Sequence, residues 1–111
     1  MTEEARIQAA ILRWCNRHRK LGIVAYRLKS TRDGAPDIVL CLQGRFVGVE
    51  TKSSTGCVSK AQGEQGKRIE KALGTYMVVH SLHEFISRME NLPTIRKGRG
   101  RIIEWGQEGL N

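Results

Sequence analysis

Residues 36–52 decide the fold of this chain, and they read PDIVLCLQGRFVGVETK. Two apolar runs flank the pair Gln43-Gly44, which predicts two antiparallel strands joined by a two-residue turn. Pairing outward from that turn places Asp37 opposite Glu50, with Cβ atoms about 4.5–5.5 Å apart. A slip of one residue would send the two carboxylates to opposite faces of the sheet, so the predicted register carries the rest of the interpretation.

The facing carboxylates predict a cation site. Like charges directly opposite each other destabilise a sheet, unless a cation lies between them or one of them is protonated. Lys52 lies two residues beyond Glu50 and projects from the same face. A divalent ion held by two carboxylates favours Mg²⁺ or Mn²⁺, with the Thr51 carbonyl as a further candidate ligand. Simpler interpretations are an arginine-paired Asp37 at a strand start and an exposed Glu50 that bridges to Lys52.

Length and charge favour a single nucleic-acid-binding domain. The chain has 111 residues, enough for one modest core, and a formal net charge of +8. The basic residues fall in four blocks, at 13–20, 27–32, 60–71 and 96–101. Clustered positive charge attracts polyanions, so a nucleic acid is the expected partner.

The cysteines and the hydropathy pattern argue against secreted and membrane classes. Cys15, Cys41 and Cys57 include no C-x-x-C pair, which disfavours both a disulfide framework and a zinc ribbon. Cys15 and Cys41 lie in apolar runs and are expected to be buried. No apolar run approaches 18 residues, so no membrane association is expected. The expected location is the cytoplasm, that of a host cell if the protein is phage-encoded.

The remaining pattern predicts an α/β protein with the order αβββαβα and a mixed sheet flanked by helices. Helices are expected at residues 2–20, 59–73 and 82–91, and strands at 23–28, 37–42, 45–52 and 75–80, with a further edge strand possible at 101–105. Thr2 and Ser81 are expected N-caps, and Gly22 and Gly74 are expected stops. Gly63 and Gly66 indicate either a close approach to the second helix or a frayed helix. Residues 1–93 are the expected domain and 94–111 a basic arm.

Several ordered motifs resemble one nuclease family. Pro36-Asp37 followed by Glu50-Thr51-Lys52 resembles the PD-(D/E)XK core, whose fold is restriction-endonuclease-like. The surrounding motifs resemble its VRR-NUC branch over residues 4–81. They are Glu4-x-x-Ile7-Gln8, Gly34-Ala35-Pro36-Asp37, Val58-Ser59-Lys60-Ala61-Gln62 and the stretch from Gly74 to Val79.

The resemblance implies a role for each matching residue. Asp37 and Glu50 would bind the catalytic metal, helped by the Thr51 carbonyl and by Glu4 from the first helix. Lys52 would be the catalytic lysine, and Gln62 would lie next to the site. Glu4 also suits a helix N-terminus as a complementary charge. Gln62 also completes a capping box with Ser59, and both of its roles can hold.

The resemblance also implies an activity. Small standalone VRR-NUC proteins, which are often phage-encoded, resemble Holliday-junction resolvases that act as dimers. The resemblance therefore implies that this chain is a Mg²⁺-dependent, structure-selective DNA endonuclease that acts on branched DNA as a homodimer. Flap or fork cleavage, nicking and a non-catalytic DNA-binding module remain alternatives. The candidate DNA-binding residues share a basic or hydroxyl side chain in or beside the basic blocks. They are Arg27, Ser30, Thr31, Arg32, Lys60, Arg96, Lys97 and Arg99.

Overall fold

The computed structural model describes residues 1–30 and 32–93. Its elements are α1 (Glu3–Arg17), the 3₁₀ turn η1 (Arg19–Leu21), β1 (Ile23–Arg27), β2 (Ile38–Leu42), β3 (Arg45–Thr51), α2 (Lys60–Lys71), β4 (Thr75–Val79) and α3 (Leu82–Glu90). The predicted order αβββαβα is confirmed. Thr31 and the whole of 94–111, including the expected arm and the possible strand at 101–105, lie outside the described residues. None of the described helices is long and apolar enough to cross a membrane.

The sheet is mixed, as predicted. The four strands lie in the order β1-β2-β3-β4, and the β1–β2 and β2–β3 pairs are antiparallel. Strand β4 pairs parallel to β3, and α2 provides the crossover between them. Ile38 faces Val49 and Leu42 faces Arg45, so the predicted hairpin register is confirmed. Gln43 and Gly44 both have positive φ, 52° and 91°, the combination that a type I′ hairpin turn requires.

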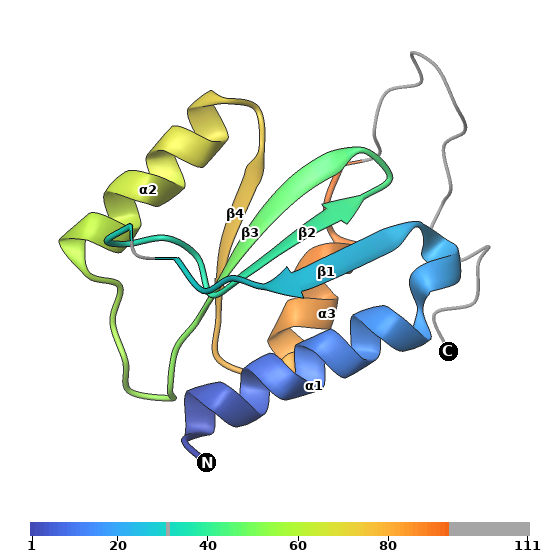
Figure 1. Cartoon of the computed structure of the whole chain (residues 1–111), viewed down its shortest axis with the longest axis horizontal. Coiled ribbons are helices and arrows are strands. Elements are labelled where there is room, and N and C mark those ends of the chain that lie inside the picture. Colours follow the sequence, from blue (N-terminus) through green and yellow to red (C-terminus); the bar gives the residue numbers. More distant parts are fainter. Residues whose placement is uncertain (31, 94–111) are drawn as a thin grey trace.

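The helices cover the two faces of the sheet unequally. Helices α1 and α3 pack on the face that carries Val47 and Val49, and α2 lies on the opposite side near β3 and β4 (Figure 1). Trp14 of α1 meets Phe85 of α3 edge to face, with ring centroids 5.7 Å apart. On the α2 side, Val24 and Tyr26 of β1 and Phe46 of β3 are exposed. Within residues 1–30 and 32–93, no helix covers the β1–β2 half of that face.

This uneven cover corrects one expectation about the cysteines. Cys15 is buried as predicted, and burial raises the pKa of its thiol to about 12. Cys41 is exposed, because residues 39 and 41 of β2 project to the sheet face that α2 leaves open. The apolar run of β2 predicted burial on both faces, whereas only Ile38, Leu40 and Leu42 enter the core.

The C-terminal ends of α1 and α2 differ from the predicted ones. Helix α1 ends at Arg17, and η1 continues to Leu21 before Gly22, which stops the segment with φ of 84° as expected. Helix α2 ends at Lys71, and Leu73, with φ of 70°, takes the left-handed position expected of Gly74. The left-handed stop of α2 therefore comes one residue before the predicted Gly74, whose amide donates to the Ile69 carbonyl.

At the start of α3, the expected N-cap Ser81 forms, but the capping box that Glu84 could complete with it does not. The Ser81 hydroxyl accepts from the Glu84 amide, as predicted. The Glu84 carboxylate, however, accepts from the amide and the ring Nδ1 of His80, at 2.7 and 2.9 Å, rather than reaching back to Ser81. These bonds to His80 help to lower the pKa of Glu84 against the opposing effect of burial, which is the largest single contribution.

The surroundings of Gly63 and Gly66 show whether these α2 glycines mark a close approach or a frayed helix. A Cβ on Gly66 would lie 2.5 Å from Cδ2 of Tyr76, so this glycine lets the helix approach the ring of a β4 residue. A Cβ on Gly63 would meet only Cγ1 of Val58, at 4.0 Å. Close approach is therefore the reason for Gly66, and it sets the distance between α2 and the sheet.

Candidate active site

Glu50 is a buried carboxylate near the end of β3, with only 2% of its surface exposed. Its Oε2 accepts a hydrogen bond from Nε2 of Gln62 at 2.8 Å and lies 3.7 Å from Nζ of Lys52. Its Oε1 is buried without a hydrogen-bond partner among the described residues. Burial, followed by the charge of Asp37, raises the pKa of Glu50 to about 7, and Lys52 acts in the opposite direction. This burial contradicts the interpretation of Glu50 as an exposed surface glutamate.

Asp37 lies immediately before β2, beside Glu50 in the hairpin. Its Oδ2 accepts hydrogen bonds from the amide of Thr51 at 2.9 Å and from the Thr51 hydroxyl at 2.7 Å. Its carbonyl accepts from the Leu28 amide at 2.8 Å, which fixes the chain just before the strand. The structure thus brings the two predicted acids together, and within residues 1–30 and 32–93 Asp37 has no arginine partner.

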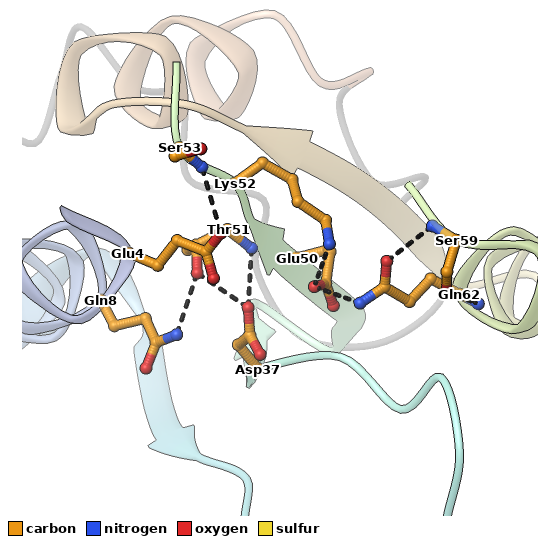
Figure 2. A network of polar contacts seen from close by, with 9 residues as sticks. All are labelled: Glu4, Gln8, Asp37, Glu50, Thr51, Lys52, Ser53, Ser59 and Gln62. Atoms are coloured by element: carbon orange, nitrogen blue, oxygen red, sulfur yellow. Dashed lines mark hydrogen bonds and ion pairs between the residues drawn. The ribbon is translucent and has the colours of Figure 1, made fainter. Parts of the chain in front are cut away.

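Thr51 positions Asp37 through its side chain as well as its amide. The threonine is fully buried, and its hydroxyl accepts from Nε2 of Gln8 at 3.0 Å while it donates to Asp37. The sequence argument gave a role only to the Thr51 carbonyl and none to Gln8. The sequence did contain a feature that could have identified Gln8, because this residue belongs to the Glu4-x-x-Ile7-Gln8 motif of the first helix. Figure 2 shows this chain of contacts running from α1 to Asp37.

Glu4 reaches from α1 to the strand end that follows the acids. Its Oε2 accepts from the Ser53 amide at 3.3 Å, and the neighbouring Glu3 accepts from the Ser54 amide at the same distance. Glu4 also lies in the first turn of α1, behind the Thr2 cap, so the dipole interpretation holds as well. Its charge is a small contribution to the raised pKa of Glu50, which places it near the site.

Gln62 links the second helix to Glu50 and also completes the predicted capping box. Its Oε1 accepts from the Ser59 amide at 2.9 Å, and its own amide donates to the Ser59 hydroxyl, which completes the capping box. Its Nε2 remains available for Glu50 (Figure 2). One side chain therefore closes the start of α2 and orients the buried carboxylate.

Tyr76 is a neighbour of the site that the sequence argument missed. Its hydroxyl is buried without a hydrogen-bond partner among the described residues. Burial, then the charges of Glu50 and Asp37, raise the pKa of Tyr76 to about 12, so the phenol stays protonated. The only sequence signal was Gly66, the glycine that makes room for this ring.

The residues present fit a divalent cation with few protein ligands. Across residues 1–30 and 32–93, no three His, Cys, Asp or Glu side chains group around one point. The donor set is therefore Asp37, Glu50 and a main-chain oxygen, while Glu4 is engaged with Ser53. The unpartnered Oε1 of Glu50 and the repulsion between the two acids are the features that a cation would relieve. Mg²⁺ retains several waters and needs only one or two carboxylates.

The predicted DNA-binding residues that the structure describes lie at the surface. Arg27, Ser30, Arg32 and Lys60 are exposed, and the Ser30 hydroxyl accepts from the Arg32 amide at 3.0 Å. Thr31, Arg96, Lys97 and Arg99 lie outside the described residues. DNA contact by any of these side chains stays a prediction.

Solved structures share this fold. One, described as a "VRR_NUC domain", is 26% identical and matches with a TM-score of 0.68 over 82% of this chain and 98% of that one. Another, described as a "VRR_NUC domain protein", matches with a TM-score of 0.65 at 14% identity, over 81% of this chain and 87% of that one. No protein-family model and no curated protein matches the sequence. These likenesses support a VRR-NUC family fold, a nuclease-type fold in which the mixed sheet is flanked by helices.

Proposed function

We propose that this protein is a Mg²⁺- or Mn²⁺-dependent, structure-selective DNA endonuclease. The observation that carries the proposal is the buried Glu50, which keeps an unpartnered oxygen beside Asp37 and a lysine at 3.7 Å. Burying Glu50 next to the half-buried carboxylate of Asp37 is costly in a protein that uses neither of them. The site lies on a nuclease-type fold in a chain of net charge +8.

In this proposal each described residue has a chemical task. When bound, the cation would supply an activated water and neutralise charge that develops on the phosphate. Asp37 and Glu50 would hold it, with the Thr51 carbonyl as a further ligand. The Thr51 amide and hydroxyl keep Asp37 in place, and Gln62 does the same for Glu50. Lys52 places an ammonium group beside Glu50, where it would orient the water or stabilise the pentavalent phosphate.

The substrate we propose is branched DNA, and among branched structures the four-way junction is the preferred candidate. A junction presents two symmetry-related cleavage positions, and a two-fold homodimer would present two matching sites. The four strands and three helices provide one set of catalytic residues per chain. Flap or fork cleavage and nicking by the same fold are the neighbouring alternatives.

Cleavage of a labelled four-way junction tests this function. Purified protein with Mg²⁺ is expected to cut at paired, symmetric positions, and EDTA is expected to abolish the products. Equal rates on the junction and on linear duplex of the same sequence would remove the junction preference and leave a general nuclease. Salt-sensitive binding without cleavage under any divalent cation would instead identify a DNA-binding module. Sedimentation of the same preparation, with and without the junction, tests the dimer.

A further inference from the structure

A concave surface lies between α2 and the sheet, apart from the acids of the candidate active site. It is a cleft of about 540 Å³ between the C-terminal half of α2 and the start of β3, and we call it the α2 cleft. Its lining includes Arg32, Phe46, Gln65, Arg68 and Ile69. This volume lies within the range of small-molecule sites, roughly 300–1,000 Å³. No residue of the Asp37–Glu50 cluster lines it.

Phe46 forms the aromatic wall of the α2 cleft. Its side chain is 47% exposed, an unusual environment for a large apolar ring. A Cβ on Gly74 would lie 3.2 Å from Cδ1 of Phe46, so the absence of a side chain there leaves room for the ring. Phe46 and Glu50 are an even number of residues apart on β3 and therefore face the same side of the sheet. The exposed ring of Phe46 and the buried carboxylate of Glu50 therefore lie on the same face of the sheet.

Two arginines and an amide supply the polar side of the α2 cleft. Arg32 and Arg68 are exposed, and neither takes part in an ion pair within the described residues. Gln65 adds an amide that can both donate and accept hydrogen bonds. An aromatic face, two cations and an amide complement three features of a nucleotide, which are the flat face of its base, its anionic phosphate and the polar edge of the base.

We propose that the α2 cleft binds one unpaired nucleotide of the DNA strand, with its base stacked on Phe46 and its phosphate held by Arg32 and Arg68. This inference rests on the proposed function, because it specifies the substrate. A base inside a continuous duplex has both faces stacked on its neighbours, whereas a base at a branch point or in a single strand has a face free for an aromatic ring. The cleft therefore selects DNA that offers such a base.

The spacing along β3 agrees with a nucleotide close to the cleavage position. Four residues of extended chain separate Phe46 from Glu50, roughly 13 Å at about 3.3 Å per residue. That distance equals about four steps of duplex DNA at about 3.4 Å each, and fewer steps of an unstacked strand. The bound nucleotide would thus lie within about four nucleotides of the scissile phosphate.

Binding measured in EDTA tests the cleft without any cleavage. The probes are a fluorescein-labelled single-stranded oligonucleotide and a duplex of the same sequence, titrated at one salt concentration. Phe46→Leu keeps the apolar contact and removes the aromatic face. We expect it to weaken single-strand binding by about 5- to 150-fold, the range for one stacked base, with duplex binding within about twofold of wild type. Phe46→Trp should retain the single-strand affinity.

The arginines need a charge-matched control. Arg68→Gln is expected to weaken single-strand binding more than Arg13→Gln does, because Arg13 is an exposed residue of α1, which packs on the opposite face of the sheet from α2 (Figure 1). Equal losses from the two variants, or equal losses by Phe46→Leu on both DNA probes, would overturn the proposal. So would a change in oligomeric state with Phe46→Leu, since the ring would then pack against a second copy of the chain. Failure of the nuclease proposal would appear separately, as junctions left uncut by wild type with Mg²⁺.

Discussion

Gln62 donates a hydrogen bond of 2.8 Å to Glu50 while its carbonyl oxygen accepts from the amide of Ser59. The start of α2 and the buried acid of β3 are therefore held by the same side chain. This arrangement links helix capping to the geometry of the site, and the two contributions can be separated by mutation.

Gln62→Ala and Ser59→Ala should differ in activity more than in stability. Each variant removes part of the capping box, which costs about 1 kcal/mol of unfolding free energy. Only Gln62→Ala also removes the hydrogen bond to Glu50. We expect it to lower junction cleavage by roughly tenfold or more, the effect of losing about 1.4 kcal/mol or more of transition-state stabilisation. Ser59→Ala should remain near wild type. Chemical denaturation and single-turnover cleavage measure the two effects, and equal activities would show that the contact is only structural.

Asp37→Asn should abolish cleavage and spare DNA binding. The substitution keeps the shape of the side chain and an oxygen that can still accept from the Thr51 amide and hydroxyl. It removes one of the two charges that would hold the cation, while the exposed basic residues are unchanged. Gel-shift titration in EDTA gives the affinity, and Mg²⁺-dependent cleavage gives the activity. Retained cleavage in this variant would refute the assignment of the site.

The raised pKa of Glu50 predicts that pH affects the stability of the metal-free protein. The pKa is about 7 in the fold against the ordinary value of 4.5, so the folded state binds the proton more tightly than the unfolded state. The contribution of Glu50 to stability is therefore full below pH 4.5 and is lost as the pH rises to about 7.

Glu50→Gln isolates this effect, because glutamine mimics the protonated acid. At pH 8 in EDTA we expect the variant to be more stable than wild type, by on the order of 1–3 kcal/mol. The difference should shrink towards pH 5. Urea denaturation at the two pH values measures it, and a variant that is less stable than wild type at pH 8 would contradict the assigned pKa. Cleavage by wild type should increase between pH 6 and 8, since cation binding needs the ionised carboxylate.

Gly66→Ala and Gly63→Ala are a matched pair within α2. Alanine normally favours a helix over glycine by about 1 kcal/mol. At Gly63 a Cβ meets nothing closer than 4.0 Å, so we expect Gly63→Ala to stabilise the protein by up to that amount. At Gly66 the Cβ would lie 2.5 Å from the Tyr76 ring, and the overpacking should cost about 1–3 kcal/mol. Thermal unfolding compares the two variants, and stabilisation by both would show that α2 moves freely against β4.

Local patterns in the sequence were enough to predict much of the site. The turn chemistry of Gln43-Gly44 and the alternation along the two strands gave the register that places Asp37 beside Glu50, because a two-residue turn leaves one pairing. The caps at Thr2 and Ser59 were equally readable, since each depends on residues within one helical turn. The left-handed residue that stops α2 was misplaced by one position, because Leu73 adopts a conformation that glycine usually takes.

What the sequence by itself determined is the set of residues and the order of the elements, since hairpin register and capping are local interactions. The tertiary structure alone decided what surrounds them. Packing of α1 brings Gln8 to Thr51, and packing of α2 brings Gln62 to Glu50 and leaves Cys41 and Phe46 uncovered. The burial that raises the pKa of Glu50 likewise depends on contacts between distant segments. The hairpin sequence was enough to predict that Asp37 and Glu50 face each other. The low-dielectric environment of Glu50 depends on the packing of the whole fold.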